Sequence, residues 1–102
     1  HMNKFRSESR RGAQVFFQSG DEVSQKLAEC IQLALNTVTE RNYAALSGDF
    51  YICRESGCPT VIVECGFLSN KEEEMLLQQQ QYRELITAAI FDGIMMYLYR
   101  FG

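Results

Sequence analysis

One glutamate in this sequence stands where α/β proteins usually do chemistry. Glu64 closes the β-branched run 60–63, Thr-Val-Ile-Val, which has no polar alternation and therefore predicts a strand buried on both faces of a parallel sheet. In open α/β sheets the functional crevice lies beyond the carboxyl ends of the strands, so this position favours a functional carboxylate. A purely structural glutamate, which accepts hydrogen bonds from the next turn or pairs with an arginine, fits the position equally well.

The residues after Glu64 predict a turn and then a short helix. Gly66 allows the backbone to turn, and Ser69 or Asn70 can cap a helix whose first turn is rich in glutamate. We expect this helix to cover residues 70–78. The chain would then pass from strand to turn to helix directly behind Glu64.

The segment 61–70 carries a family resemblance. Its sequence, Val-Ile-Val-Glu-Cys-Gly-Phe-Leu-Ser-Asn, follows Cys58-Pro59 and precedes a glutamate-rich stretch. This arrangement resembles the last signature of zinc-dependent N-acetylmuramoyl-L-alanine amidases, which hydrolyse peptidoglycan, and most of all the variants of spore-forming, Gram-positive bacteria. The resemblance implies that Glu64 is the catalytic general base, which takes a proton from zinc-bound water and hands it to the leaving nitrogen. The substrate implied is the amide between N-acetylmuramic acid and the L-alanine of the stem peptide.

The start of the sequence carries a second resemblance. His1 and Asn3 resemble the second histidine motif of the same family, which precedes a Gly-Ala-x-x-Phe strand, here residues 12–16. The resemblance implies that His1 is a Zn²⁺ ligand. A His-Met pair is also a common remnant of tag removal, so both interpretations stay open. The family's other ligands, a histidine and a glutamate, come from the half of the domain before residue 1, so we expect an incomplete ligand set and an inactive fragment.

Length, composition and charge limit the class of protein. The chain has 102 residues, 46% of them apolar, which allows one modest core. Because the resemblance covers nearly all of it, we interpret residues 1–102 as the C-terminal portion of a single zinc amidase catalytic domain. The net charge of -3 argues against nucleic-acid binding, which needs a basic surface. No apolar run approaches the roughly 20 residues that span a bilayer, and no signal peptide is visible.

The family resemblance also implies where the parent protein works. Its partner would be peptidoglycan, and its location extracytoplasmic, at the cell wall or the spore cortex, with a role linked to sporulation. Arg10 and Arg11 lie in a polar segment that we expect to be a loop, which either faces solvent or lines a groove for the anionic polymer.

Apolar periodicity predicts the elements that position Glu64. It predicts strands over 13–18, 50–53 and 60–64, and helices over 23–38, 70–78 and 82–100. The inward residues of the first helix are predicted to be Val23, Leu27, Cys30, Ile31, Ala34 and Val38. Those of the last helix are Tyr82, Leu85, Ile86, Ala89, Ile90, Gly93, Met96 and Tyr97, a core stripe with no cofactor role. Gly93 is expected at a close approach to the sheet. This order predicts an α/β fold: part of a three-layer sandwich with a mainly parallel sheet flanked by helices.

The four cysteines do not predict a disulfide framework. Cys30, Cys53, Cys58 and Cys65 lie in or beside apolar segments, which suits reduced, half-buried thiols. The spacing Cys53-x4-Cys58 is looser than that of structural zinc sites, so a cysteine metal site is disfavoured.

A missing half-domain would have a structural consequence. An unpaired sheet edge and uncovered apolar helix faces would lead the chain to associate with the missing N-terminal half or with a second copy of itself. Two other interpretations stay open. One is a noncatalytic remnant of the amidase fold that binds peptidoglycan or a protein, and the other is an unrelated α/β domain in which Glu64 is structural.

Overall fold

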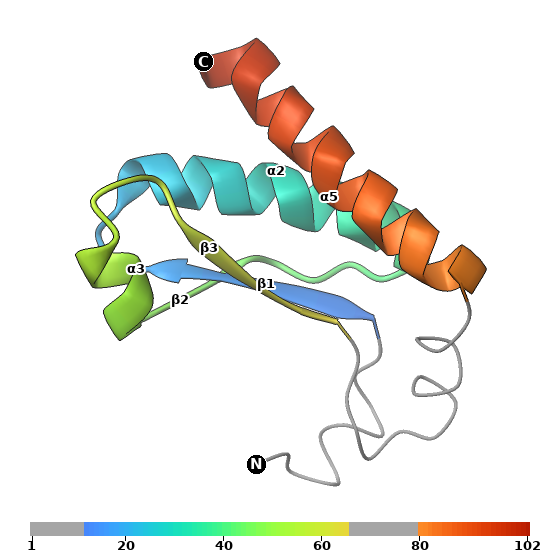
Figure 1. Ribbon diagram of the computed structural model, residues 1–102, viewed down its shortest axis with the longest axis horizontal. Helices are drawn as coiled ribbons and strands as arrows, with labels where there is room; N and C mark the ends of the chain where they lie inside the picture. Colours follow the sequence, from blue (N-terminus) through green and yellow to red (C-terminus); the bar gives the residue numbers. More distant parts are fainter. Residues whose placement is uncertain (1–11, 66–79) are drawn as a thin grey trace, which may run out of the picture.

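A computed structural model describes residues 12–65 and 80–102 of the chain (Figure 1). In chain order its elements are strand β1 (Ala13–Gln18), helix α2 (Glu22–Thr39), strand β2 (Leu46–Gly48), helix α3 (Tyr51–Glu55), strand β3 (Val61–Cys65) and helix α5 (Gln80–Phe101). Helices α2 and α5 cross on one side of the sheet, and α3 lies at the end where β1 and β2 finish (Figure 1). The α/β class is confirmed, and the helix expected over 70–78 lies outside the described residues.

The three strands of the described sheet lie in the order β2-β1-β3. β1 and β2 are parallel, with Phe16 opposite Leu46, because α2 carries the chain back to its starting end between them. β1 and β3 are antiparallel, with Gln14 opposite Glu64, because the chain turns through α3 and then returns. The prediction of a mainly parallel sheet is therefore corrected in this part of the chain, where one ladder is parallel and the other antiparallel.

The two faces of the sheet have different surroundings. The face toward α2 and α5 carries the core residues Ala13, Val15 and Phe17 of β1 and, less deeply buried, Val61, Val63 and Cys65 of β3. Because side chains alternate along a strand, Gln14, Phe16, Ile62 and Glu64 belong to the opposite face. The prediction that the Glu64 strand is buried on both faces is corrected. β3 is an edge strand of the described sheet, and α2 and α5 cover one face of it.

Helix α2 is fixed at its start by a network around Ser24. The Asp21 carboxylate accepts hydrogen bonds from the Ser24 backbone N–H at 3.0 Å and from its hydroxyl at 2.7 Å, and these bonds lower the pKa of Asp21. The Ser24 hydroxyl also accepts a hydrogen bond from the Thr60 N–H at 3.0 Å, so Ser24 faces inward. Val23, predicted inward, is therefore exposed, and the buried face of the predicted helix is shifted toward Ala28, Ile31 and Leu35.

The segment over 50–53, predicted as a strand, begins helix α3 instead. The Phe50 N–H donates a hydrogen bond to the Gln18 side chain at 2.8 Å, and the Phe50 ring packs edge-on against Phe16 with centroids 5.7 Å apart. The strand that pairs with β1 lies earlier, at Leu46–Gly48. A four-residue apolar run cannot distinguish one helical turn from a short strand, which explains the wrong prediction.

Helix α5 crosses α2 at a glycine. Ile86, Ala89 and Gly93 form its buried face. A Cβ atom on Gly93 would lie 2.4 Å from the Cα of Ile31, so only glycine permits this approach. The close approach predicted for Gly93 is thus made to α2 and not to the sheet, and Leu85, predicted inward, is exposed. Neither α5 nor any other helix in the described residues is long and apolar enough to cross a membrane.

The cysteines are free thiols, as predicted. Cys30 and Cys53 are buried, Cys65 is half-buried and Cys58 is exposed. Burial raises the pKa of the Cys30 thiol, which makes it a poor nucleophile.

Candidate functional site

Glu64 lies near the end of β3 with its side chain on the face of the sheet opposite α2 and α5. The side chain is exposed. Its carboxylate makes no hydrogen bond and no ion pair in the described part of the chain. The structural alternative, in which an arginine or a buried turn holds Glu64, therefore has no support from residues 12–65 and 80–102. Within these ranges Glu64 is an exposed carboxylate on a strand whose backbone pairs with β1.

The cross-strand neighbour of Glu64 is turned away from it. Gln14 lies directly opposite Glu64 and is only 2% exposed. Its amide group donates hydrogen bonds to the Ala44 carbonyl at 2.8 Å and to Gln32 Oε1 at 3.0 Å. Ala44 precedes β2, so this amide bends toward the β2 side of β1, whereas Glu64 stands on the β3 side. The arrangement leaves the Glu64 carboxylate free on its inner side.

A buried glutamine of α2 completes the edge of β1 beside this site. β2 pairs only with residues Phe16 to Gln18 of β1. At the earlier residues of β1, the Gln32 side chain takes the place of a neighbouring strand. Its Oε1 accepts the Val15 N–H at 2.8 Å, and its Nε2 donates to the Ala13 carbonyl at 3.0 Å. Buried backbone groups need such partners, so Gln32 allows β1 to stay ordered as far as Glu64.

The amide network continues to the connection before β2. Gln32 Nε2 also donates to Asn36 Oδ1 at 3.0 Å, and Asn36 Nδ2 donates to the Tyr43 carbonyl at 2.8 Å. Sequence analysis missed Gln14, Gln32 and Asn36. One signal was present, because Gln32 falls between Ile31 and Leu35 on the inward face, where a polar residue needs a partner.

The end of the sheet on which Glu64 lies differs from the one expected. Ala13 lies opposite Cys65, so β3 finishes where β1 begins, and the carboxyl ends of β1 and β2 lie at the other end. The prediction that Glu64 shares the carboxyl edge of a parallel sheet is corrected, because β3 is antiparallel to its neighbour. The chain does enter β1 at the Glu64 end.

The carboxyl ends of β1 and β2 carry a different polar cluster. Asp49 accepts a hydrogen bond from Gln18 Nε2 at 3.0 Å and pairs with Arg54. First Gln18 and then Arg54 lower the pKa of the Asp49 carboxyl. Arg54 also lies 3.8 Å from the Glu55 carboxylate. The Asp49 carboxylate is thus paired with Gln18 and Arg54, and these contacts join α3 to the ends of the strands.

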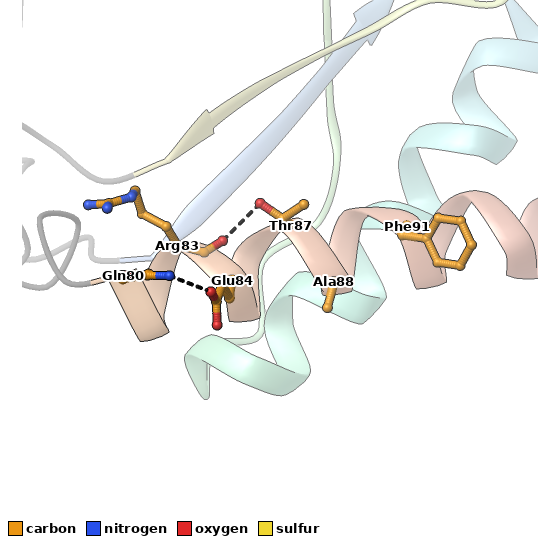
Figure 2. A pocket seen from close by; sticks show the side chains of 6 residues that line it. All are labelled: Gln80, Arg83, Glu84, Thr87, Ala88 and Phe91. Carbon is orange, nitrogen blue, oxygen red and sulfur yellow. Dashed lines mark hydrogen bonds between the residues drawn. The ribbon is translucent and has the colours of Figure 1, made fainter.

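A cavity of about 460 Å³ lies on α5 (Figure 2). Its described lining is Gln80, Arg83, Glu84, Thr87, Ala88 and Phe91. Gln80 donates a hydrogen bond to Glu84 at 3.0 Å, and the Thr87 hydroxyl donates to the Arg83 carbonyl at 2.8 Å (Figure 2). Glu64 is not among these residues, so the cavity and the open carboxylate are separate features.

Comparison with known proteins identifies the family of this chain. A model of the N-acetylmuramoyl-L-alanine amidase family matches residues 1–96. The chain belongs to this family. It is 30% identical over 99 residues to the germination-specific N-acetylmuramoyl-L-alanine amidase of Bacillus subtilis. That alignment covers 95% of this chain and 42% of the relative. It is 33% identical over 101 residues to the N-acetylmuramoyl-L-alanine amidase LytC of Bacillus subtilis, in an alignment that covers 95% of this chain and 20% of LytC.

Solved amidase structures have the same fold. The CwlD amidase of Clostridioides difficile, in complex with the GerS lipoprotein, matches with a TM-score of 0.86 at 37% identity over 97% of this chain and 52% of that one. An N-acetylmuramoyl-L-alanine amidase of Clostridium difficile 630 matches with a TM-score of 0.84 at 25% identity, over 91% of this chain and 51% of that one. The chain thus spans about half the length of these amidases. The predicted membership of the N-acetylmuramoyl-L-alanine amidase family is confirmed.

The described residues of this amidase-family chain do not form a complete metal site. Within 12–65 and 80–102 no group of three or more His, Cys, Asp or Glu side chains could hold a metal ion. His1 is the single histidine of the chain and lies outside these ranges, as do Arg10 and Arg11. Catalytic zinc usually takes three protein ligands. A zinc site that includes this chain therefore needs ligands from beyond the described residues.

Proposed function

We propose that this chain is part of a zinc-dependent peptidoglycan hydrolase that cleaves the amide between N-acetylmuramic acid and the L-alanine of the stem peptide. Membership of the amidase family supports the reaction. The observation that carries the proposal within this chain is the Glu64 carboxylate, which is exposed near the end of an ordered strand and has no partner among the described residues.

Glu64 is the general base in this proposal. Pairing with β1 fixes the backbone of Glu64, and the Gln14 amide is occupied by Ala44 and Gln32, so the carboxylate is free to accept a proton. It accepts that proton from the attacking water and returns it to the leaving nitrogen. A bound Zn²⁺ supplies a more acidic water and polarises the scissile carbonyl.

His1 is one zinc ligand in this proposal. The support is the family resemblance of the His1 motif, together with the entry of the chain into β1 at the Glu64 end of the sheet. The remaining ligands belong to the first half of the catalytic domain, which is the partner that completes the site. By this proposal residues 1–102 alone are inactive.

The proposed setting is extracytoplasmic, at the cell wall or the spore cortex. One relative is a germination-specific amidase, which supports a role in spores. The CwlD relative was solved in complex with the GerS lipoprotein, and we extend to this chain the expectation of a protein partner.

The test compares Glu64→Gln with Glu55→Gln in the protein that contains the complete catalytic domain. Release of stem peptide from purified peptidoglycan, zinc content and thermal unfolding are measured for each. We expect Glu64→Gln to lower kcat roughly 10²–10⁴-fold, because general acid–base catalysis contributes about that factor. Zinc content and folding should not change. Glu55 is exposed on α3, so its variant should keep wild-type kcat.

Two outcomes would reject parts of the proposal. Unchanged hydrolysis by the Glu64→Gln protein shows that Glu64 is not the base. A wild-type protein that binds peptidoglycan but holds no zinc and releases no peptide is the noncatalytic remnant instead.

A further inference from the structure

The sheet register places Gln14 beside Glu64. The two residues lie directly opposite each other in the antiparallel ladder between β1 and β3. Directly opposite residues have their Cβ atoms roughly 4.5–5.5 Å apart on the same face of the sheet, so a glutamine and a glutamate side chain can meet there. A hydrogen bond from an amide to a carboxylate is stronger than one to a neutral carbonyl. A freely rotating Gln14 amide would therefore donate to Glu64.

The Gln14 amide nitrogen has three neutral acceptors instead. It donates to the Ala44 carbonyl at 2.8 Å, to Gln32 Oε1 at 3.0 Å and to the Val15 carbonyl at 3.3 Å. An NH₂ group has two hydrogens, so these acceptors use its full donor capacity. Gln14 is buried, whereas Glu64 is exposed. The amide is thus held at the edge of β1 and is turned from the carboxylate opposite it.

Gln32 is the side chain among these three acceptors, and other bonds fix its orientation. Its Nε2 uses both hydrogens, on the Ala13 carbonyl at 3.0 Å and on Asn36 Oδ1 at 3.0 Å. Its Oε1 therefore faces β1, where it accepts the Val15 N–H as well as the Gln14 amide. A reversed Gln32 amide would set two NH₂ groups against each other and lose these bonds. The network has one direction, and it ends on Gln14.

We propose that Gln32 is a positioning residue that holds the Gln14 amide away from the Glu64 carboxylate. The inference rests on the general-base role proposed for Glu64. A base that accepts a hydrogen bond from a neighbouring amide is stabilised before the reaction and loses that bond when it takes up a proton, which raises the barrier. Gln32 removes this competition without introducing a charge. The carboxylate thereby stays available to the attacking water.

The first test is a mutant cycle in the protein that contains the complete catalytic domain. Gln32→Leu releases the Gln14 amide and should lower kcat roughly 10-fold or more, the factor that one hydrogen bond to a charged group represents. The double variant Gln14→Leu/Gln32→Leu lacks the competing amide and should recover most of the wild-type kcat. Gln14→Leu alone should keep it. Peptide release from purified peptidoglycan is measured at saturating substrate and at a temperature where every variant remains folded.

Recovery in the double variant separates a positioning role from a structural one. The double variant has fewer hydrogen bonds than either single variant, so a purely structural network would make it both the least stable and the slowest protein. We expect it to be the least stable but not the slowest. Asn36→Ala is the matched control, because it removes bonds from the same network but leaves Gln32 Oε1 on the Gln14 amide. This variant should lose stability and keep kcat.

The second test is a nuclear magnetic resonance measurement that does not depend on catalysis. The side-chain NH₂ resonance of Gln14 is assigned by its loss from the spectrum of the Gln14→Leu protein. Glu64→Gln should shift this resonance only slightly in the otherwise wild-type protein. In the Gln32→Leu background the same substitution should shift it several times further, because the released amide then bonds to the carboxylate.

The outcomes distinguish this proposal from the assignment of the base. Full hydrolysis by the Glu64→Gln protein rejects the general base, and the positioning role falls with it even where the resonance shows the contact. With an inactive Glu64→Gln protein, wild-type kcat in Gln32→Leu would overturn the positioning role alone. A double variant slower than Gln32→Leu, or a Gln14 resonance that responds equally to Glu64→Gln in both backgrounds, would also overturn it.

Discussion

Two exposed carboxylates lie at opposite ends of the same small sheet, and their surroundings differ. Where β1 and β2 finish, Asp49 accepts a hydrogen bond from Gln18 and pairs with Arg54, and these partners lower its pKa. At the other end Glu64 has no hydrogen bond or ion pair within the described residues. Asp49 uses its charge to join α3 to the strands, whereas no described residue pairs with the charge of Glu64.

The means of stabilisation differ in the same way. The Asp49 end is held by charged side chains, and the Glu64 end is held by the neutral amides of Gln14, Gln32 and Asn36. Neutral amides satisfy the backbone at the edge of β1 without placing a cation beside Glu64. The comparison teaches that a fold can order the strand next to an exposed carboxylate without pairing that carboxylate with a cation from the described residues.

The largest expected difference between the two carboxylates is in turnover by the complete catalytic domain. Asp49→Asn should leave kcat within about twofold of wild type, against the roughly 10²–10⁴-fold loss expected for Glu64→Gln. Hydrolysis of purified peptidoglycan under saturating substrate measures both. A loss of similar size in both variants would break the comparison, because Asp49 would then also belong to the active site.

The next largest effect is on stability at the Glu64 end. Gln32→Leu leaves the Val15 N–H and the Ala13 carbonyl without their partners, and we expect it to lower the free energy of unfolding by about 2–4 kcal/mol. Urea unfolding measures the change. Gln25→Leu is the matched control on the same helix and should cost less than about 0.5 kcal/mol. The Gln25 side chain is exposed, and among the described residues it bonds to the Glu29 side chain alone.

A small cost for Gln32→Leu would mean that the edge of β1 is closed by some other group. The variant should also lower the activity of the complete domain, because the strand opposite Glu64 would no longer be fixed. Wild-type activity at a temperature where the variant remains folded would show that this amide network supports the fold alone.

Sequence analysis predicted the long, periodic elements well. The helices over 22–39 and 80–101 and the strand over 13–18 agree with the predictions because many residues contribute to each repeat. It failed at α3, where four residues were too few to define a period. That error carried over to the direction of β3, since a chain that turns through α3 returns antiparallel.

Of the candidate site in the described residues, sequence analysis named Glu64 but not the amide side chains around it. The identity of Glu64 came from a local motif, and so did the assignment to the amidase family. The Gln14 and Gln32 network could not be predicted in the same way. Its partners are backbone groups about 17 to 30 residues away, which become neighbours only after folding.

The smallest expected effect is the acid dependence of the Asp49 end. The folded-state pKa of Asp49 lies below its ordinary value of 3.8, so the stability that it contributes is present above about pH 4 and is lost as pH falls through the folded pKa. Because the carboxylate is exposed, solvent screens much of this contribution. Asp49→Asn should therefore lower the urea midpoint slightly at pH 6 and narrow the difference from wild type at pH 3. A constant difference at both pH values would show that the Asp49 charge contributes nothing, and that the two ends of the sheet differ in geometry but not in electrostatics.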